Sequence, residues 1–261
     1  MTAPRFAFLG TSGAVASAER DNTSLVVQAG AAAVLLDCGG SAVHRLRRLG
    51  VDPLSLTHVV VTHLHVDHAY GLPSLVRQLG LLGRTTPLTV VCRPEHVDPL
   101  RTLLTVFRVW ERADMFALAL APVDLAVGAV AFASGPLRVS TAPNAHGPMP
   151  NFAVRVDTDA GALVYSSDTQ PTETVVALAR GAAVLVHEAT FAERDRTPAR
   201  GATHSSAADA GRIAAAAAVG RLILTHVGPD YHADVTALAR EAHLHFAGPI
   251  EVAADLHFYS L

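Results

Sequence analysis

Short apolar runs recur along the whole chain and alternate with segments of helical character. Several runs end in Gly, Asp or His, a pattern that is typical of buried strands. We expect strands at 6–10, 24–28, 33–37, 58–63, 88–92, 137–143, 152–158, 162–168, 183–189, 221–227 and 250–260. Helices are expected at 41–50, 72–83, 94–110, 171–181 and 205–220.

The order of these elements predicts the architecture. Strands follow one another directly early in each half, and strand and helix then alternate, which indicates two packed sheets covered by helices. No Pro-, Gly- or Ser-rich linker divides the chain. The sequence therefore predicts an α/β protein with one domain over residues 1–261, a length that can bury a large core.

Composition narrows the function classes. The formal net charge is −3 and all 20 basic residues are arginine, which argues against a protein that holds a nucleic-acid backbone non-specifically. Pro122 and Asp124 interrupt the longest apolar stretch, so no membrane contact is expected. The segment MTAPRFAFLG lacks the pattern of a secretory signal, which indicates a cytoplasmic protein. Cys38 and Cys92 are too few for a disulfide framework or a thiolate metal site.

The stretch THLHVDHAYGLP, residues 62–73, places three histidines and an aspartate within six positions directly after a predicted buried strand. Side chains that follow such a strand are carried on a rigid base. His63 and His65 can converge on one metal ion, while Asp67 and His68 can hold a second. Imidazole and carboxylate suit zinc, and equally iron or manganese. This density of potential ligands favours a metal site over an ordinary polar loop.

The HLHVDH segment resembles the HxHxDH signature of the metallo-β-lactamase fold, a four-layered αββα sandwich with a dinuclear metal site between its sheets. Within that fold the chain is most similar to ribonuclease Z and its relatives, because further segments match in order. These are LLDCGG at 35–40, DHAYGLP at 67–73, HEATF at 187–191 and THSS at 203–206. The resemblance also implies a homodimer.

The resemblance implies two divalent metal ions, Zn²⁺ or alternatively Mn²⁺ or Fe, and a specific ligand set. The first ion would take His63, His65 and His146. The second would take Asp67, His68 and His226. Asp168 would bridge both ions, and its alternative role is that of a helix N-cap.

Paired divalent ions lower the pKa of a shared water and polarise the substrate oxygen. Asp67 could orient that water or accept its proton. In ribonuclease Z-like proteins a histidine in the segment that matches THSS protonates the leaving group, which assigns this role to His204 with Glu188 as its orienting partner. The alternatives are structural: a buried hydrogen-bonded pair at His187 and Glu188, and an exposed histidine at a helix start.

Two departures from the family bear on the substrate. Ribonuclease Z enzymes that process tRNA typically carry a long tRNA-gripping arm between the positions that match His146 and Asp168. Only 21 residues separate these two residues here, enough for a strand hairpin. Val66 stands where the motif usually has Gly, which would narrow the approach to the metals. These departures favour a small-molecule substrate and argue against nucleic acid as a partner.

Two further segments are candidates for the surroundings of the site. The loop 192–202 contains Arg194, Arg196 and Arg200 between the HEATF and THSS segments, and it is the candidate for a mobile, anion-contacting loop. Among the histidines outside the matched motifs, His232 is the candidate for lining the site.

The preferred hypothesis is therefore a dinuclear metal-dependent hydrolase, a phosphodiesterase that acts on a small phosphodiester through a metal-bound hydroxide. One alternative is a carbon-ester hydrolase such as a lactonase, thioesterase, arylsulfatase-like or β-lactamase-like enzyme, because the same nucleophile attacks carbonyls. A ribonuclease Z-type tRNA 3′ endonuclease is another. A non-enzymatic metal-binding protein that kept this fold would be expected to lack one or more of the metal ligands. A redox protein would hold iron in the same ligands.

Overall fold

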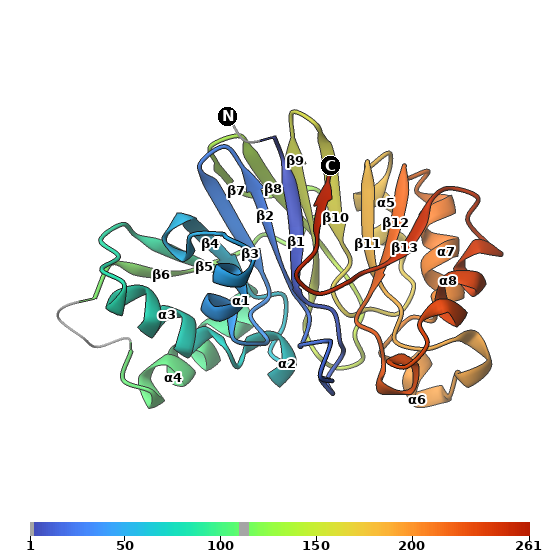
Figure 1. The fold of residues 1–261 in the computed structure, drawn as a ribbon, viewed down its shortest axis with the longest axis horizontal. Helices are drawn as coiled ribbons and strands as arrows, with labels where there is room; N and C mark the ends of the chain where they lie inside the picture. The colour runs from blue at the N-terminus through green and yellow to red at the C-terminus, as the bar shows by residue number, and fades with distance from the viewer. Residues whose placement is uncertain (1–2, 110–114) are drawn as a thin grey trace.

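The computed structural model describes residues 3–109 and 115–261, and Figure 1 shows their arrangement. The described residues form two seven-stranded sheets that stand face to face, with helices on both outer sides. None of the helices in these ranges has the length and apolar character needed to cross a membrane. The last residue of the helix predicted over 94–110 lies outside the described residues.

The first sheet has the strand order β14-β1-β2-β3-β4-β5-β6. Its strands are β1 (Arg5–Gly10), β2 (Ser24–Ala29), β3 (Ala32–Leu36), β4 (Leu56–Val60), β5 (Leu88–Cys92), β6 (Leu118–Pro122) and β14 (Phe258–Ser260). Pairing is antiparallel from β14 to β3 and parallel from β3 to β6. The carboxyl ends of β3, β4 and β5 therefore lie at one edge of the sheet.

The second sheet repeats this plan with the order β13-β12-β11-β10-β9-β8-β7. Its strands are β7 (Ala129–Ser134), β8 (Leu137–Pro143), β9 (Phe152–Thr158), β10 (Gly161–Tyr165), β11 (Val184–Glu188), β12 (Arg221–Thr225) and β13 (Ile250–Val252). The strands from β7 to β10 pair antiparallel, and those from β10 to β13 pair parallel. The carboxyl ends of β10, β11 and β12 thus share one edge.

The helices lie on the two outer faces of the sheets (Figure 1). The first sheet is covered by α1 (Ala42–Arg48), α3 (Leu72–Leu81) and α4 (Val97–Val106), and the second by α5 (Glu173–Ala179), α7 (Ala207–Ala216) and α8 (Thr236–His243). One-turn helices α2 (Val66–Ala69) and α6 (Pro198–Gly201) lie in the loops at the strand ends. Short 3₁₀ turns occupy Pro53–Ser55, Pro94–His96, Glu193–Asp195 and Pro229–Tyr231.

Three apolar layers hold the elements together. Phe6, Phe152 and Tyr165 belong to the layer between the sheets, and each is no more than 1% exposed. Separate clusters fill the spaces between each sheet and its helices. Every residue of β3 is buried because both faces of that strand are covered, which explains its continuous apolar run. The predicted four-layered αββα sandwich is confirmed.

The strand predicted over 250–260 is wrong as a single element. The segment forms two strands, and β13 joins the edge of the second sheet while β14 joins the edge of the first. Between them the Asp255 carboxylate accepts hydrogen bonds from the Thr11 hydroxyl and the Asp21 backbone N–H, and Leu256 takes a left-handed φ of 58°. These contacts redirect the chain from one sheet to the other. Helix α8 has no counterpart among the predicted helices.

Candidate metal centre

Loops from both sheets converge at the edge where the parallel strands end. His63 and His65 follow β4, and Asp67 and His68 lie in α2 directly after them. From the second sheet, Asp168 follows β10. Two further loops from that sheet contribute His146 and His226, which follow β8 and β12. Ligand sites form at the carboxyl ends of parallel strands because several loops meet there.

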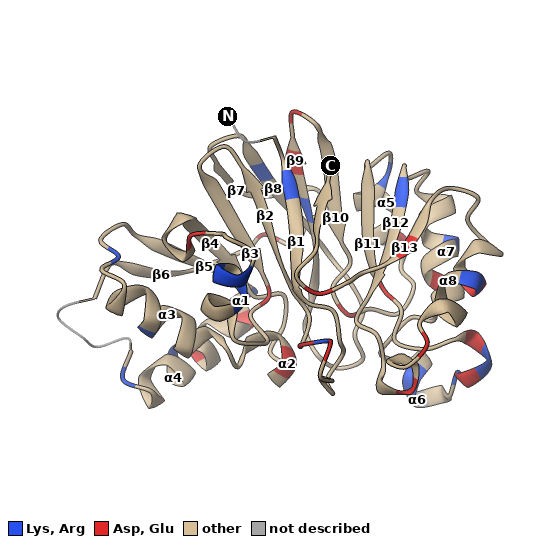
Figure 2. Ribbon diagram, viewed as in Figure 1, with Lys and Arg blue, Asp and Glu red and all other residues tan. Residues whose placement is uncertain are grey.

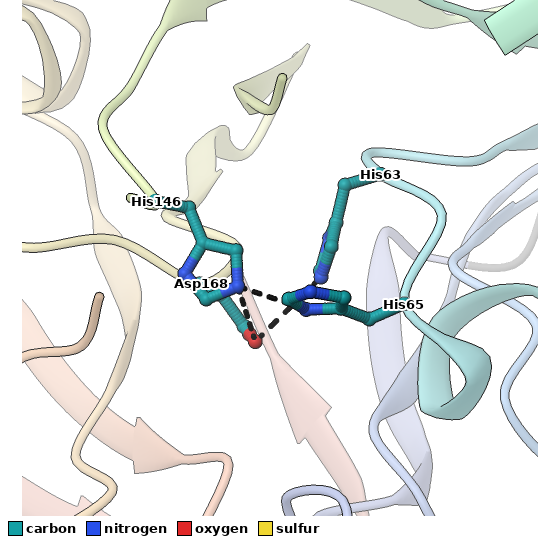
Figure 3. Close-up of side chains that lie close together, drawn as sticks. All are labelled: His63, His65, His146 and Asp168. Atoms are coloured by element: carbon teal, nitrogen blue, oxygen red, sulfur yellow. Dashed lines mark hydrogen bonds and ion pairs between the residues drawn. The ribbon is translucent and has the colours of Figure 1, made fainter. Parts of the chain in front are cut away.

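The predicted ligands gather into adjoining groups. Potential ligand atoms of His63, His65, His146 and Asp168 lie within 4.8 Å of one another, and Figure 3 shows these four side chains pointing toward a common centre. The corresponding atoms of Asp67, His68 and His226 meet the same 4.8 Å limit.

The carboxylate of Asp168 lies between the two groups, and both of its oxygen atoms approach histidines. Its Oδ2 lies 3.7 Å from His63 Nε2 and 3.1 Å from His226 Nε2, while its Oδ1 lies 3.3 Å from His68 Nε2. The alternative role of Asp168 as a helix cap does not match the structure, because helix α5 is capped by the side chain of Thr172.

Buried polar atoms without a hydrogen-bond partner point into this space. Among the described residues they include Nε2 of His63, His68 and His226, and Oδ1 of Asp168. An unpaired buried polar atom costs about 1–3 kcal/mol, so such atoms call for a partner. Two divalent cations would accept electron pairs from these atoms, and imidazole with carboxylate is a donor set that suits zinc, iron or manganese. The residues present therefore fit metal ions.

The imidazoles divide into two classes by pKa. Burial lowers the pKa of His63, His65 and His146 below the ordinary value, which keeps these rings in the neutral form that binds metal. Burial also acts on His68 and His226, but Asp168 and the other neighbouring carboxylates together outweigh it, so the pKa of His68 is raised and that of His226 reaches about 10. The carboxylates of this site therefore stabilise positive charge beside them, which either protonated histidines or bound metal ions can supply.

Asp37 orients the histidines of this centre through their Nδ1 side, a role that was not predicted from the sequence. Its carboxylate accepts a 2.8 Å hydrogen bond from His68 Nδ1 and a 2.9 Å hydrogen bond from the Tyr165 hydroxyl. It also accepts from the backbone N–H and hydroxyl of Thr62, and the Thr62 oxygen lies 3.2 Å from His63 Nδ1. Partners of this kind fix the ring and its tautomer, leaving Nε2 free for a metal. The signal in the sequence is the position of Asp37 at the end of an apolar strand.

Replacement of Asp37 by alanine should weaken metal binding by about 10- to 100-fold, because His68 would lose the acceptor that holds its ring. Competition with a chromogenic chelator would measure the affinity. Asp157→Ala is the matched control. Asp157 lies on β9, away from the centre, and its carboxylate is 2.9 Å from the Arg155 guanidinium. Equal metal affinity in both variants would exclude an orienting role for Asp37.

Backbone strain marks three of the strand ends at this site. Asp37, Ser167 and His226 have φ values of 59°, 52° and 55°, in the left-handed region that residues other than glycine rarely adopt. Strain of this kind persists where the surrounding contacts over-determine it, and it clusters at functional sites. Here it turns the chain sharply at the ends of β3, β10 and β12.

His204 and Glu188 meet as the sequence predicts. His204 Nδ1 donates to Glu188 Oε1 at 3.1 Å, and the same carboxylate accepts from the Thr169 backbone N–H and the Thr190 hydroxyl. Because the Thr190 proton goes to Glu188, the Thr190 oxygen accepts from His226 Nδ1 at 2.9 Å. Glu188 therefore connects His204 to one of the clustered histidines.

The environment of His204 favours its protonated form. Burial lowers the pKa of the ring, but the carboxylates of Glu188 and Asp168 outweigh burial and raise the pKa above the ordinary value. The His204 side chain is 21% exposed, whereas that of Glu188 is 1% exposed. His204 can therefore reach a bound molecule with Nε2 while Nδ1 stays on Glu188.

The loop 192–202 differs from the expected anion-contacting loop. Arg196 pairs with Glu193 and Asp209, and Arg200 lies 3.0 Å from Asp230. Figure 2 shows acidic and basic segments side by side around α6. These ion pairs hold the loop to neighbouring carboxylates, so most of its positive charge is matched locally.

Two other predictions concern single residues near the site. His232 Nε2 lies 3.0 Å from the Ser12 hydroxyl, so it contacts a loop beside His226 and does not enter the ligand groups. Val66 is 73% exposed and lies on α2, next to His65 and Asp67 in the chain. Its side chain borders a hollow on the outer side of α2, which places it differently from the expected obstruction above the metals.

Comparison with known proteins identifies relatives along most of the chain. The family described as beta-lactamase superfamily domain matches residues 32–227. A ribonuclease Z of Halorubrum lacusprofundi is 30% identical, over 94% of this chain and 93% of its own. Among solved structures, the metallo-beta-lactamase fold protein YhfI from Bacillus subtilis is 21% identical, with a TM-score of 0.83 over 99% of both chains. Human tRNase Z, short form, is 21% identical, with a TM-score of 0.79 over 98% of both chains.

The fold and a cluster of histidines and aspartates able to bind metal define a metal-dependent hydrolase of the metallo-β-lactamase fold. The chain belongs to the beta-lactamase superfamily, as a ribonuclease Z-like member. This confirms the resemblance inferred from HLHVDH and the four segments that accompany it.

Proposed function

We propose that this protein hydrolyses phosphodiester bonds in RNA, in the manner of a ribonuclease Z. The observation that carries the proposal is His204, which donates Nδ1–H to the buried Glu188 at 3.1 Å beside the metal centre. An RNA phosphodiester has an alkoxide leaving group, which needs a proton, and a histidine with a raised pKa can supply one. The ribonuclease Z relatives support RNA better than the small phosphodiester expected from the sequence, and they run against the expectation that nucleic acid is not a partner.

In this proposal the predicted side chains would hold two divalent ions, and zinc is the preferred metal. His63, His65 and His146 would hold one ion, Asp67, His68 and His226 would hold the other, and Asp168 would serve both. When bound, the ions would activate a water and polarise the phosphoryl group. Asp67, 8% exposed at the mouth of the cluster, would orient the attacking water and accept its proton.

His204 and Glu188 act on the leaving group. As the phosphorus–oxygen bond breaks, the proton on His204 Nε2 passes to the leaving oxygen, which departs as an alcohol. Glu188 keeps Nδ1 protonated and stabilises the imidazolium before the transfer. The Thr169 N–H and the Thr190 hydroxyl hold the Glu188 carboxylate at 2.6 and 2.7 Å, so it presents a fixed oxygen to His204.

A specific observation favours a second candidate, hydrolysis of a small phosphodiester. Strands β9 and β10 are joined directly, since Thr158 pairs with Gly161 across a two-residue turn of Asp159 and Ala160. The stretch between His146 and Asp168 therefore has no room for an arm that grips RNA. An RNA substrate would have to bind through the surface around the site alone.

The test uses protein treated with a chelator and then reloaded with zinc or manganese. We expect turnover of bis(p-nitrophenyl) phosphate only in the reloaded protein, together with cleavage of an RNA hairpin that carries a 3′ extension. Turnover of the diester without RNA cleavage would support the second candidate. Reaction with only a p-nitrophenyl carboxylate ester or a lactone would overturn both in favour of a carbon-ester hydrolase. Light scattering on the same sample would test the predicted homodimer.

A further inference from the structure

Helix α2 separates two environments on its opposite faces. Asp67 and His68 face the metal centre, and their side chains are at most 10% exposed. Val66, Ala69 and Tyr70 fall at helical spacing on the other face, where Val66 is 73% and Tyr70 49% exposed. Exposed apolar side chains this close to a polar site are unusual, and in ligand sites they line a binding surface.

Those side chains border a hollow of about 230 Å³ between α2 and α4. It is lined by Leu64, Val66, Ala69, Tyr70, Pro99, Leu100 and Leu103. Leu64 and Val66 flank His65 in the chain, so the hollow begins one residue away from the ligand cluster on both sides of that histidine. Figure 1 shows α2 and α4 as neighbours at the loop end of the first sheet.

The hollow and His204 are supplied by elements of different sheets. His204 contacts two rings supplied by the second sheet: it meets the ring of His146 edge-on at 4.8 Å and stacks on that of His226 at 5.3 Å. The hollow is made by elements of the first sheet, next to His65. A phosphodiester bound at the metals with its leaving oxygen toward His204 would therefore direct its other substituent toward α2 and α4.

We propose that this hollow, the α2–α4 pocket, binds a planar aromatic group on the retained side of the phosphodiester, the side that keeps the phosphate. The inference rests on the proposed function, and in RNA the group is the base of the nucleotide that retains the 5′-phosphate. The pocket takes one fragment of a ligand, since complete small-molecule sites span about 300–1,000 Å³. Its apolar wall and the aromatic side chain of Tyr70 suit burial of an aromatic ring.

The composition of the pocket also predicts how selective it is. The residues that line it are aliphatic except for Tyr70, so they offer few groups that could read the hydrogen-bonding edge of a base. Stacking of bases on aromatic side chains is tolerant of sequence because every base has a π-face. The pocket should therefore distinguish an aromatic from an aliphatic substituent, and hardly distinguish one base from another.

The test compares phenyl p-nitrophenyl phosphate with methyl p-nitrophenyl phosphate on metal-loaded protein. Both release the same leaving group, so the difference reports the retained side only. We expect the phenyl-to-methyl ratio of kcat/KM to fall about tenfold in Val66→Ser and in Leu103→Ser, because the ring loses apolar contacts. Val106→Ser is the matched control: Val106 is 70% exposed on the same helix as Leu103 but does not line the pocket.

A binding measurement keeps the inference separate from the proposed function. Calorimetry with phenyl phosphate and methyl phosphate needs no turnover, and we expect the unaltered protein to bind the phenyl compound more tightly. Leu103→Ser should remove that preference, while Val106→Ser should retain it. Equal affinity for the two compounds, or a preference that survives Leu103→Ser, would overturn the proposed role of the pocket even if diesters are hydrolysed. A preference of the expected kind without diester turnover would support the pocket and count against the proposed function.

Discussion

The Asp168→Ala variant should lose bound metal and with it most of its phosphodiesterase activity. Asp168 is the carboxylate that approaches both groups of histidines, at 3.7 Å from His63 in the first and 3.3 Å from His68 in the second. Loss of a residue that only orients a ligand already costs about 10- to 100-fold in affinity or activity, so loss of a shared ligand should cost more than about 100-fold. Metal analysis after gel filtration, together with diester hydrolysis, would measure both effects.

The control for this experiment is Asp159→Ala, in the exposed turn between β9 and β10. Asp168→Asn adds a variant of nearly unchanged shape, in which only the charge is removed. Both Asp168 variants should also lower the pKa of His226, because the Asp168 carboxylate is the main group that raises it. Full metal content in Asp168→Ala would show that the residue is not a bridging ligand.

The second large effect is expected for His204→Ala. Loss of a general acid costs about 10²- to 10⁴-fold when the leaving group is a poor one. The variant should therefore lose activity on RNA or an alkyl diester, and lose far less on bis(p-nitrophenyl) phosphate, whose leaving group needs little protonation. Metal content should stay unchanged, because the neighbouring histidines remain. His243→Ala, an exposed histidine on α8, is the control.

The pH profile adds a test that a purely structural role of His204 would not produce. The acid must be protonated, so kcat/KM should fall as the pH rises through the pKa of His204, which Glu188 holds above its ordinary value. In Glu188→Gln that support is lost, and the basic limb of the profile should move to lower pH. Equal losses on good and poor leaving groups in His204→Ala would remove His204 from the acid role.

Local features determined much of what the sequence predicts. The apolar run of β3 marks that strand well because the strand is covered on both faces and has no polar positions. The cluster from His63 to His68 is recognisable because its members lie within one turn of chain. The 250–260 segment misleads for the opposite reason: its pattern is continuous, and only contacts at Asp255 divide it between two sheets.

Other properties arise only when the sheets pack. His146, Asp168, His204 and His226 are far apart in the chain, and register and layer packing bring them to one edge. Asp37 looks like any strand-end carboxylate until His68 in α2 and Tyr165 in β10 contact it. The arginines of 192–202 resemble an anion site until Asp209 and Asp230 pair with them.

The sequence by itself determined the sandwich, most of its elements and the identity of the chemical groups, because these follow from patterns within a few residues. It missed α8 and the edge strands β6 and β7. The tertiary structure decided which groups share charge and hydrogen bonds, and it placed an apolar pocket behind α2, because those relations depend on distances between segments remote in the chain.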